Sequence, residues 1–388
     1  MKWTRFVRAK SVCAYFFVGP GLMYGLFTSR MPALKEQVQA NEAEIGFVLL
    51  AFGFAALVGL TSCASFIRRF TSRKVIRWAS FVLMFTLPLC GCMTSPLGLG
   101  LAAVSMGFLT GLVDVAMNAQ AIQLEKRFAA PCLALMHASY SLGGLIGALS
   151  SALFAALSLP PLVNFSVVMA VYMLPRPWAV PRLAKDQVIK NREGAEEKKG
   201  RKGFALPPLA VIAAGLIAAC CYSGEGTVGE WGSLYLFSIK GSSEQMAALV
   251  YACFSISTLT CRLFADMLRT HFSDFSLAFC GGILAVSGMC IVLNSPYAPL
   301  CLAGYCCMGL GMAPMVPLCF SFAGKCPRVT PDEASAVVSV LGYAGLLTCP
   351  PIIGTVAHAY GLDKALYIAL LLTILLVVGS FLFRTRRR

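Results

Sequence analysis

The sequence predicts an all-α integral membrane protein with twelve transmembrane helices in two pseudo-symmetric six-helix bundles. Of its 388 residues, 58% are hydrophobic and 13% are charged, and the mean hydropathy is +0.76. The apolar residues form long continuous runs, as spanning helices of roughly 20 residues require, whereas the strands of a membrane barrel are shorter and alternate in polarity. One polar, charged segment separates these runs into two equal sets.

Twelve apolar runs account for the predicted spans. In chain order they are 11–30, 45–67, 75–93, 97–123, 132–157, 160–175, 205–223, 245–264, 276–294, 297–323, 334–357 and 364–383. The charged segment 176–204 has too few apolar residues to pack a core. We therefore expect an N-terminal bundle over 1–175, a cytoplasmic linker over 176–204 and a C-terminal bundle over 205–388. The linker could also tether the chain to anionic lipid.

The basic residues predict the orientation in the membrane. The net charge is +15, and 28 of the 32 Lys and Arg residues lie in the two terminal segments and in alternate loops. The opposite loops hold Arg30, Lys35, Lys240 and Lys364. Because basic loops stay in the cytoplasm, we expect a multi-pass protein of the plasma or bacterial inner membrane with both termini cytoplasmic. This distribution argues against a nucleic-acid-binding patch.

Signatures of catalysis and metal binding are absent from the sequence. None of the 17 cysteines has Cys-x-x-Cys spacing, and there are three histidines, so we predict no metal site. The chain has no Gly-x-Ser-x-Gly, Walker A or His-Glu-x-x-His motif, so we expect neither an enzyme nor a cofactor.

The fourth run contains the residue that points most directly to function. Asp114 lies deep in this run, and intramembrane acids usually face a water-filled path or a partner. Asn118 follows one helical turn later on the same face. Because burial favours the neutral form of a carboxyl group, we predict that Asp114 carries a proton. The alternatives are a structural acid bonded to a neighbouring helix, or a sodium ion held by Asp114 and Asn118.

The fifth run adds polar groups at one face. His137 and Tyr140 share that face, and we predict that both contribute to a solute site. For His137, an interhelical hydrogen bond is favoured over a proton relay. Gly143 and Gly147 have the spacing typical of close helix contact.

The seventh run ends in two acids among glycines. Glu225 and Glu230 lie near its outer end, with Trp231 next in the chain, and all three are candidate substrate-binding residues. The glycines match a nucleotide-binding pattern, but no strand precedes them, so we favour a loosened helix at a cavity. Trp231 could instead anchor the interface. Arg30, after the first run, either extends to the interface or binds an anionic group of the substrate.

Prolines interrupt the tenth run. Pro314 and Pro317 lie in the segment GLGMAPMVPLCFSFAG. Proline within a spanning helix frees backbone carbonyls, so these residues predict a kink or gate.

Several segments together resemble the major facilitator superfamily, and within it the fucose permease-like branch of sugar:proton symporters. They are TSRMPALK, GLVDVAMNAQ, HASYSLGGLIGAL, GEGTVGEWGSLYL, GLGMAPMVPL and LGYAGLLTCPPIIG, in this order along nearly the whole chain. The resemblance implies two six-helix bundles around a central cavity that opens alternately to each side. It implies proton coupling and substrate binding at Asp114 and Asn118, and matches a family acid and tryptophan to Glu230 and Trp231.

The sequence also departs from this family. Fucose-type members carry a second acid in the first span, where this chain reads GLMYGLFTSR. In the basic loop after the second span, Arg68 and Thr71 replace the usual aspartate and glycine. The corresponding loop of the second half retains Arg262 and Asp266, so the resemblance implies gating contacts there.

These observations predict a monomeric secondary transporter of a small polar solute, with sugars suggested by the resemblance. We expect proton coupling, with sodium as the alternative ion, and contact with membrane lipid but not with nucleic acid. Two other functions fit the sequence. One is a proton-driven exporter of amphiphilic compounds, and the other is a membrane sensor that binds solute without moving it.

Overall fold

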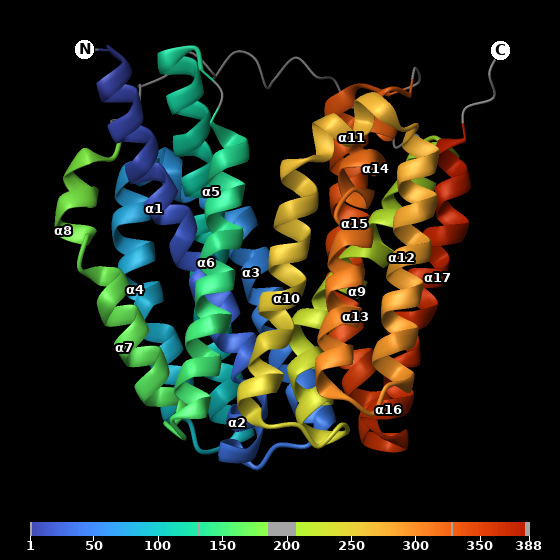
Figure 1. The fold of residues 1–388 in the computed structure, drawn as a ribbon. Coiled ribbons are helices and arrows are strands. Elements are labelled where there is room, and N and C mark those ends of the chain that lie inside the picture. The colour runs from blue at the N-terminus through green and yellow to red at the C-terminus, as the bar shows by residue number, and fades with distance from the viewer. Residues whose placement is uncertain (1, 131, 185–206, 327–328, 385–388) are drawn as a thin grey trace.

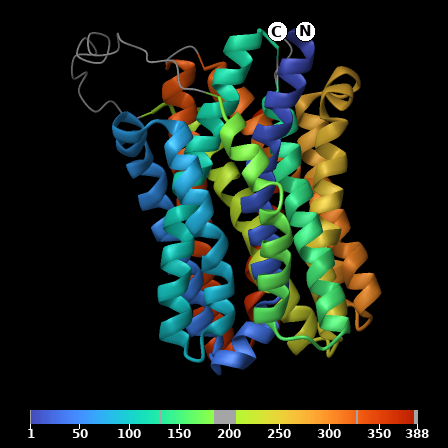
Figure 2. The same cartoon turned by 90° about the vertical axis from the view of Figure 1, so that its left-hand side faces the viewer.

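The computed structural model describes residues 2–130, 132–184, 207–326 and 329–384, and every regular element in them is a helix. Figure 1 shows these helices as two upright groups, one formed by each half of the chain. The helix that begins the described chain and the helical turn that ends it lie at the same end, which Figures 1 and 2 show at the top.

The first bundle contains six long or medium helices and three short helical segments. They are α1 (Lys2–Ser29), α2 (Met31–Val38), α3 (Glu42–Phe70), α4 (Ser72–Cys92), α5 (Pro96–Phe128), α6 (Leu133–Ala156), α7 (Pro161–Met173), α8 (Arg176–Ala179) and the 3-10 turn η1 (Val180–Arg182). Figure 2 shows this bundle from its outer side, with α2 lying at the end away from the start of α1.

The second bundle repeats this plan with more interruptions. Its elements are α9 (Leu209–Ser238), α10 (Glu244–Leu263), α11 (Ala265–His271), α12 (Asp274–Asn294), α13 (Ala298–Met312), α14 (Met315–Gly324), α15 (Pro331–Tyr360), α16 (Leu362–Ala365), α17 (Tyr367–Gly379) and η2 (Ser380–Phe383). The predicted tenth span is thus two helices, because Pro314 separates α13 from α14.

Eleven stretches of the described chain are long and apolar enough to cross a membrane. The predicted sixth span is the exception, since α7 has 13 residues and begins at Pro161. Helical structure continues beyond it through Arg182, so the predicted linker 176–204 begins with ordered helical turns. Arg176 anchors them, because its buried guanidinium donates to Ser80 Oγ at 2.9 Å. The remainder of that linker, from residue 185, lies outside the described residues.

Glycines set the closest helix contacts within each bundle. A Cβ at Gly21 of α1 would collide with the carbonyl oxygen of Tyr140 in α6. The predicted packing role of Gly143 is confirmed, since a Cβ there would collide with the carbonyl oxygen of Val18. In the second bundle, α12 and α13 meet in the same way at Gly288. In lipid, no hydrophobic force draws helices together, so their association depends on van der Waals packing. Small residues allow the close approach that this packing requires.

The two bundles meet along α6 and α10 and along α3 and α15. At the α2 end, α3 and α15 cross so closely that a Cβ at Gly354 would lie 2.6 Å from the carbonyl oxygen of Glu42. Ser233 Oγ of α9 donates to the carbonyl oxygen of Thr28 in α1 at 2.8 Å. The bundles are therefore joined at the end opposite the start of α1.

Candidate functional site

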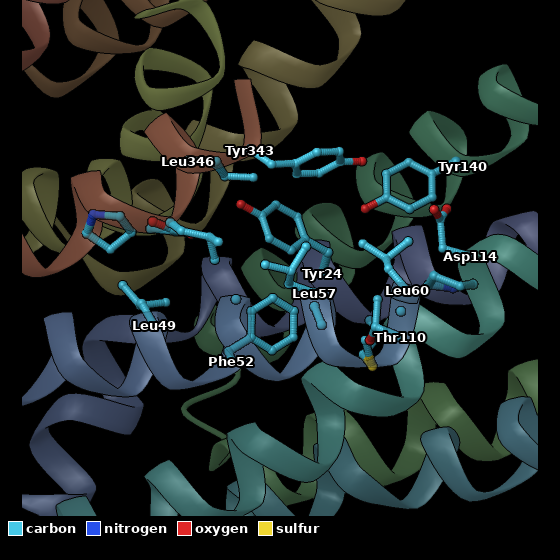
Figure 3. Close-up of a pocket in the computed structure, with 18 of the residues that line it drawn as sticks. Tyr24, Leu49, Phe52, Leu57, Leu60, Thr110, Asp114, Tyr140, Tyr343 and Leu346 are labelled. Atoms are coloured by element: carbon cyan, nitrogen blue, oxygen red, sulfur yellow. The ribbon is translucent and has the colours of Figure 1, made fainter. Parts of the chain in front are cut away.

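A cavity of about 320 Å³ lies between the two bundles (Figure 3). Its wall is formed by α1, α3, α5 and α6 from the first bundle and by α9 and α15 from the second. The lining residues are Pro20, Met23, Tyr24, Leu49, Phe52, Gly53, Ala56, Leu57, Leu60, Thr110, Gly111, Asp114, Met117, His137, Tyr140, Glu230, Tyr343, Leu346, Leu347 and Pro350. Both bundles contribute, so their relative movement would reshape the cavity.

Asp114 lines this cavity, and Asn118 holds it from the next turn of α5. The Asn118 Nδ2 group donates to the carbonyl oxygen of Asp114 at 2.8 Å and lies 3.4 Å from its Oδ1 atom. Asn118 is not among the lining residues, so the structure places it as a support for Asp114. Sequence spacing predicted that these two side chains share a face, and this placement is confirmed.

His137 and Tyr140 of α6 both reach the cavity, as their predicted face requires. The His137 ring packs edge-on against Phe17, with ring centroids 5.8 Å apart. Figure 3 shows the Tyr140 ring next to the Asp114 carboxyl group. Helix α6 therefore brings an imidazole and a phenol to the wall that carries the acid.

Glu230 and Trp231 are neighbours in sequence, but the structure separates their roles. Glu230 lines the cavity while being 6% exposed, and its Oε2 atom has no hydrogen-bond partner among the described residues. Trp231 is fully buried in the core and is not part of the lining. Glu230, rather than Trp231, therefore borders the cavity, with one carboxyl oxygen that is buried and lacks a partner among the described residues.

Glu225 belongs to a second cavity of about 200 Å³. This cavity shares Tyr24, Tyr140 and Leu346 with the first, so the two adjoin. Glu225 Oε1 lies 3.6 Å from Nη2 of Arg262, whose side chain is 44% exposed. Arg262, predicted as a gating residue, thus contributes the positive charge of this second cavity.

Arg30 lies away from both cavities. Its Nε atom is 3.0 Å from Glu244 Oε1 of α10, and its Nη2 group donates to the carbonyl oxygen of Leu159 at 2.7 Å. The Arg30 side chain is 2% exposed, so it neither extends to an interface nor faces the solute site. The structure places it as an ion-pair bridge between the bundles at their closed end.

Two further predicted gating residues, Pro314 and Pro317, do not line the central cavity. Pro314 and Pro317 line a small pocket of about 40 Å³ with Arg262 and not the central cavity. Asp266 belongs to α11, and its side chain lies outside the described part of the chain.

Three aromatic residues of the site were not anticipated. Tyr24, Phe52 and Tyr343 come from three different helices, and Figure 3 shows their rings around the cavity. Tyr24 and Tyr343 each follow or precede a glycine within an apolar span, which is a signal that could have been used. Phe52 also precedes a glycine, Gly53, but phenylalanine is common at lipid-facing positions, so this pattern does not single it out.

Exposure indicates where the cavity opens. Glu230, toward the α2 end, is 6% exposed, whereas Tyr343, nearer the start of α15, is 41% exposed. Arg262, at the far end of α10, is also exposed. The cavity is therefore reached from the end where the described chain begins and ends, and it is closed at the α2 end.

Comparisons with known proteins agree with this architecture. Residues 13–332 match the family model of the Major Facilitator Superfamily. An uncharacterized transporter of Sinorhizobium fredii is 30% identical over 371 residues, which cover 95% of this chain and 96% of that protein. Membrane protein MosC of Rhizobium meliloti is 28% identical over 387 residues, covering 97% and 90% of the two chains.

Solved structures show the same fold at low identity. The nucleoside transporter NupG superposes with a TM-score of 0.76 at 14% identity, over 98% of this chain and 100% of that chain. A D-xylose-proton symporter superposes with a TM-score of 0.75 at 14% identity, over 97% of each chain. With a central cavity between two bundles and a family match over most of its length, the chain belongs to the Major Facilitator Superfamily and is a multi-pass membrane transporter.

Proposed function

We propose that this transporter moves a small polar solute by alternating access and couples the movement to protons at Asp114. The observation that carries the proposal is the cavity between the bundles, which is closed at one end and is lined by an acid, Asp114, with the Asn118 amide 3.4 Å from its Oδ1 atom. A site walled by both bundles can change the side to which it opens when the bundles rock against each other. We further propose that 1–175 and 205–388 move as the two rigid bodies.

Protonation would control this rocking through the charge of Asp114. An unpaired carboxylate is costly in a dry, closed state, because its attraction to water is lost. Neutral Asp114 would allow the cavity to close on both sides, and release of the proton would favour the state open to water. In this proposal, the Asn118 amide, 3.4 Å from Asp114 Oδ1, would restrain the carboxyl group at the cavity wall.

The α2 end would face the outside of the cell. Most Lys and Arg residues belong to segments at the opposite end, and basic segments stay cytoplasmic. The described conformation would then be open to the cytoplasm, with the bridge between Arg30 and Glu244 closing the outer side. The cavity lies within one chain, so a monomer suffices for transport.

The solute class is suggested by the fucose permease-like segments, which favour a sugar or a related compound. Export of amphiphilic compounds is the second candidate, and the cavity wall favours it. Leu49, Leu57, Leu60 and Leu347 line the cavity together with aromatic rings, which is typical of sites that bind apolar bodies. Both functions use the same mechanics and differ in direction.

A stability screen followed by a flux assay tests the proposal. Sugars, sugar acids, nucleosides, peptides and amphiphiles are added to purified protein, and a specific ligand is expected to raise its unfolding temperature. Uptake of that ligand is then measured in proteoliposomes with an imposed pH gradient. Accumulation that follows the gradient supports the proposal, whereas specific binding without flux would instead indicate a sensor.

A further inference from the structure

The charges that face the two adjoining cavities are unequal. Among their described lining residues, the acids are Asp114, Glu225 and Glu230, and Arg262 provides the one Lys or Arg side chain. Arg262 already pairs with Glu225. Two carboxyl groups, those of Asp114 and Glu230, therefore line the central cavity without a Lys or Arg in its described wall, where His137 is the one other titratable nitrogen base.

Glu230 is the more deeply placed of these two groups. It is more than nine-tenths buried, it lines the cavity, and its Oε2 atom lacks a hydrogen-bond partner among the described residues. A buried acceptor without a donor is unfavourable, and native structures rarely leave one without a functional reason. A donor carried by the solute would satisfy it at the closed end of the cavity.

Aromatic rings surround the same space. The rings of Tyr24, Phe52, Tyr140 and Tyr343 line the cavity, and Figure 3 shows them around it. Ring faces attract cations, and this attraction strengthens where water is excluded. A wall of rings and aliphatic side chains, with acids at two points, suits a cation that has an apolar body.

The wall is less suited to the other solute classes. The lining of both cavities contains no Asn or Gln among the described residues, although such amides commonly fix several hydroxyl groups at once. An anion would be repelled by Asp114 and Glu230, and Arg262 is shared with Glu225.

We propose that the transported solute carries a protonated amine, that Glu230 accepts a hydrogen bond from this ammonium group, and that the aromatic rings hold its apolar body. This inference rests on the proposed transport function and narrows its solute to organic cations. It applies equally to uptake and to export.

Two series of matched probes test the inference, and in each series a cation, a neutral compound and an anion share one molecular body. Phenethylamine, 2-phenylethanol and phenylacetate share a phenyl ring, and glucosamine, glucose and glucuronate form a second series on a polar body. Binding of each radiolabelled probe to the purified full chain in nanodiscs is measured by equilibrium dialysis. We expect the amine of a series to bind at least about tenfold more tightly than its neutral and anionic analogues, and phenethylamine to bind more tightly than glucosamine.

Variants of Glu230 test whether this residue causes the preference for amines. Glu230→Gln keeps the shape of the side chain and is expected to remove most of the preference for amines, while Glu230→Asp retains part of it. The matched control is Asp363→Asn, which removes an exposed acid of α16 outside both cavities and should leave binding unchanged.

Three results would overturn the inference. They are binding of the neutral or anionic probes as tightly as the amines, an amine preference that survives in Glu230→Gln, and failure of every amine to bind. Because the readout is binding rather than flux, it can fail separately from the proposed function. Gradient-driven uptake of a neutral solute would keep the transport proposal and exclude an amine substrate, whereas amine binding without flux would exclude transport alone.

Discussion

Removing the charge of Glu244 is expected to loosen the closed end of the transporter. Glu244 forms the ion pair with Arg30 that links α10 to the segment between α1 and α2. The two residues belong to different bundles, so the pair can exist only while the α2 end is shut. In Glu244→Gln, the attraction is lost and the Arg30 guanidinium keeps its hydrogen bond to the Leu159 carbonyl oxygen.

The size of the effect follows from burial. Removing one partner of a fully buried ion pair costs about 3–5 kcal/mol. The Arg30 side chain is 2% exposed, but the Glu244 side chain is 24% exposed, so water already screens part of the attraction. We expect the closed α2 end to lose about 1–3 kcal/mol of stabilisation, which changes the ratio of closed to open molecules by about 5- to 150-fold.

Fluorescence energy transfer across the closed end measures this shift. Positions Leu97 and Tyr297 are exposed near the ends of α5 and α13 on the α2 side and belong to opposite bundles. Noncanonical amino acids with clickable groups place dyes there without labelling the 17 cysteines. In Glu244→Gln, a population with a longer distance between the dyes is expected to appear.

A second ion pair provides the matched control. Lys35 Nζ lies 2.8 Å from Glu42 Oε1, also at the α2 end, but α2 and α3 belong to one bundle. Lys35→Gln should therefore leave the distance distribution unchanged. If Glu244→Gln has the same distribution as the unmodified protein, or if Lys35→Gln opens the end equally, the assignment of Arg30 and Glu244 as the closing contact is refuted.

Three further predictions follow from the structure. Gly21→Ala places a methyl group against the Tyr140 carbonyl oxygen and should destabilise the protein by about 1–3 kcal/mol in thermal unfolding, whereas Gly324→Ala, which meets nothing within 4 Å, should not. Asn118→Leu frees the Asp114 carboxyl group and should weaken gradient-driven uptake more than solute exchange, and equal loss of both would contradict this role. A reporter fused to either terminus should be read out as cytoplasmic, and an external signal would contradict the predicted orientation.

The sequence was sufficient for those parts of the fold and site that depend on local pattern. Long apolar runs predicted the spans because a bilayer sets their length, and helical spacing predicted that Asp114 and Asn118 share a face. The glycine spacing in α6 likewise predicted a close helix contact. The sixth span was less regular than expected, because prolines shorten α7 and Arg176 binds the following turns back onto α4.

Parts of the site that depend on how the bundles associate could not be read from the chain. Arg30 was predicted to bind substrate or reach the interface. Its ion pair was missed because the partner, Glu244, is more than 200 residues away and belongs to the other bundle. Trp231 follows Glu230 directly, yet helix geometry turns it into the core. The contribution of Tyr343 depends on the contact between α15 and α3, which no local pattern encodes.

The most direct test of proton-coupled alternating access is transport by Asp114→Asn in proteoliposomes, with the ligand found in the stability screen. The substitution keeps the side chain's shape and mimics its neutral form. Gradient-driven accumulation should fall to background, while exchange of labelled for unlabelled solute across the membrane continues. Asp363→Asn should accumulate solute normally. Accumulation in Asp114→Asn that still follows the pH gradient would contradict the role of Asp114 as the proton site.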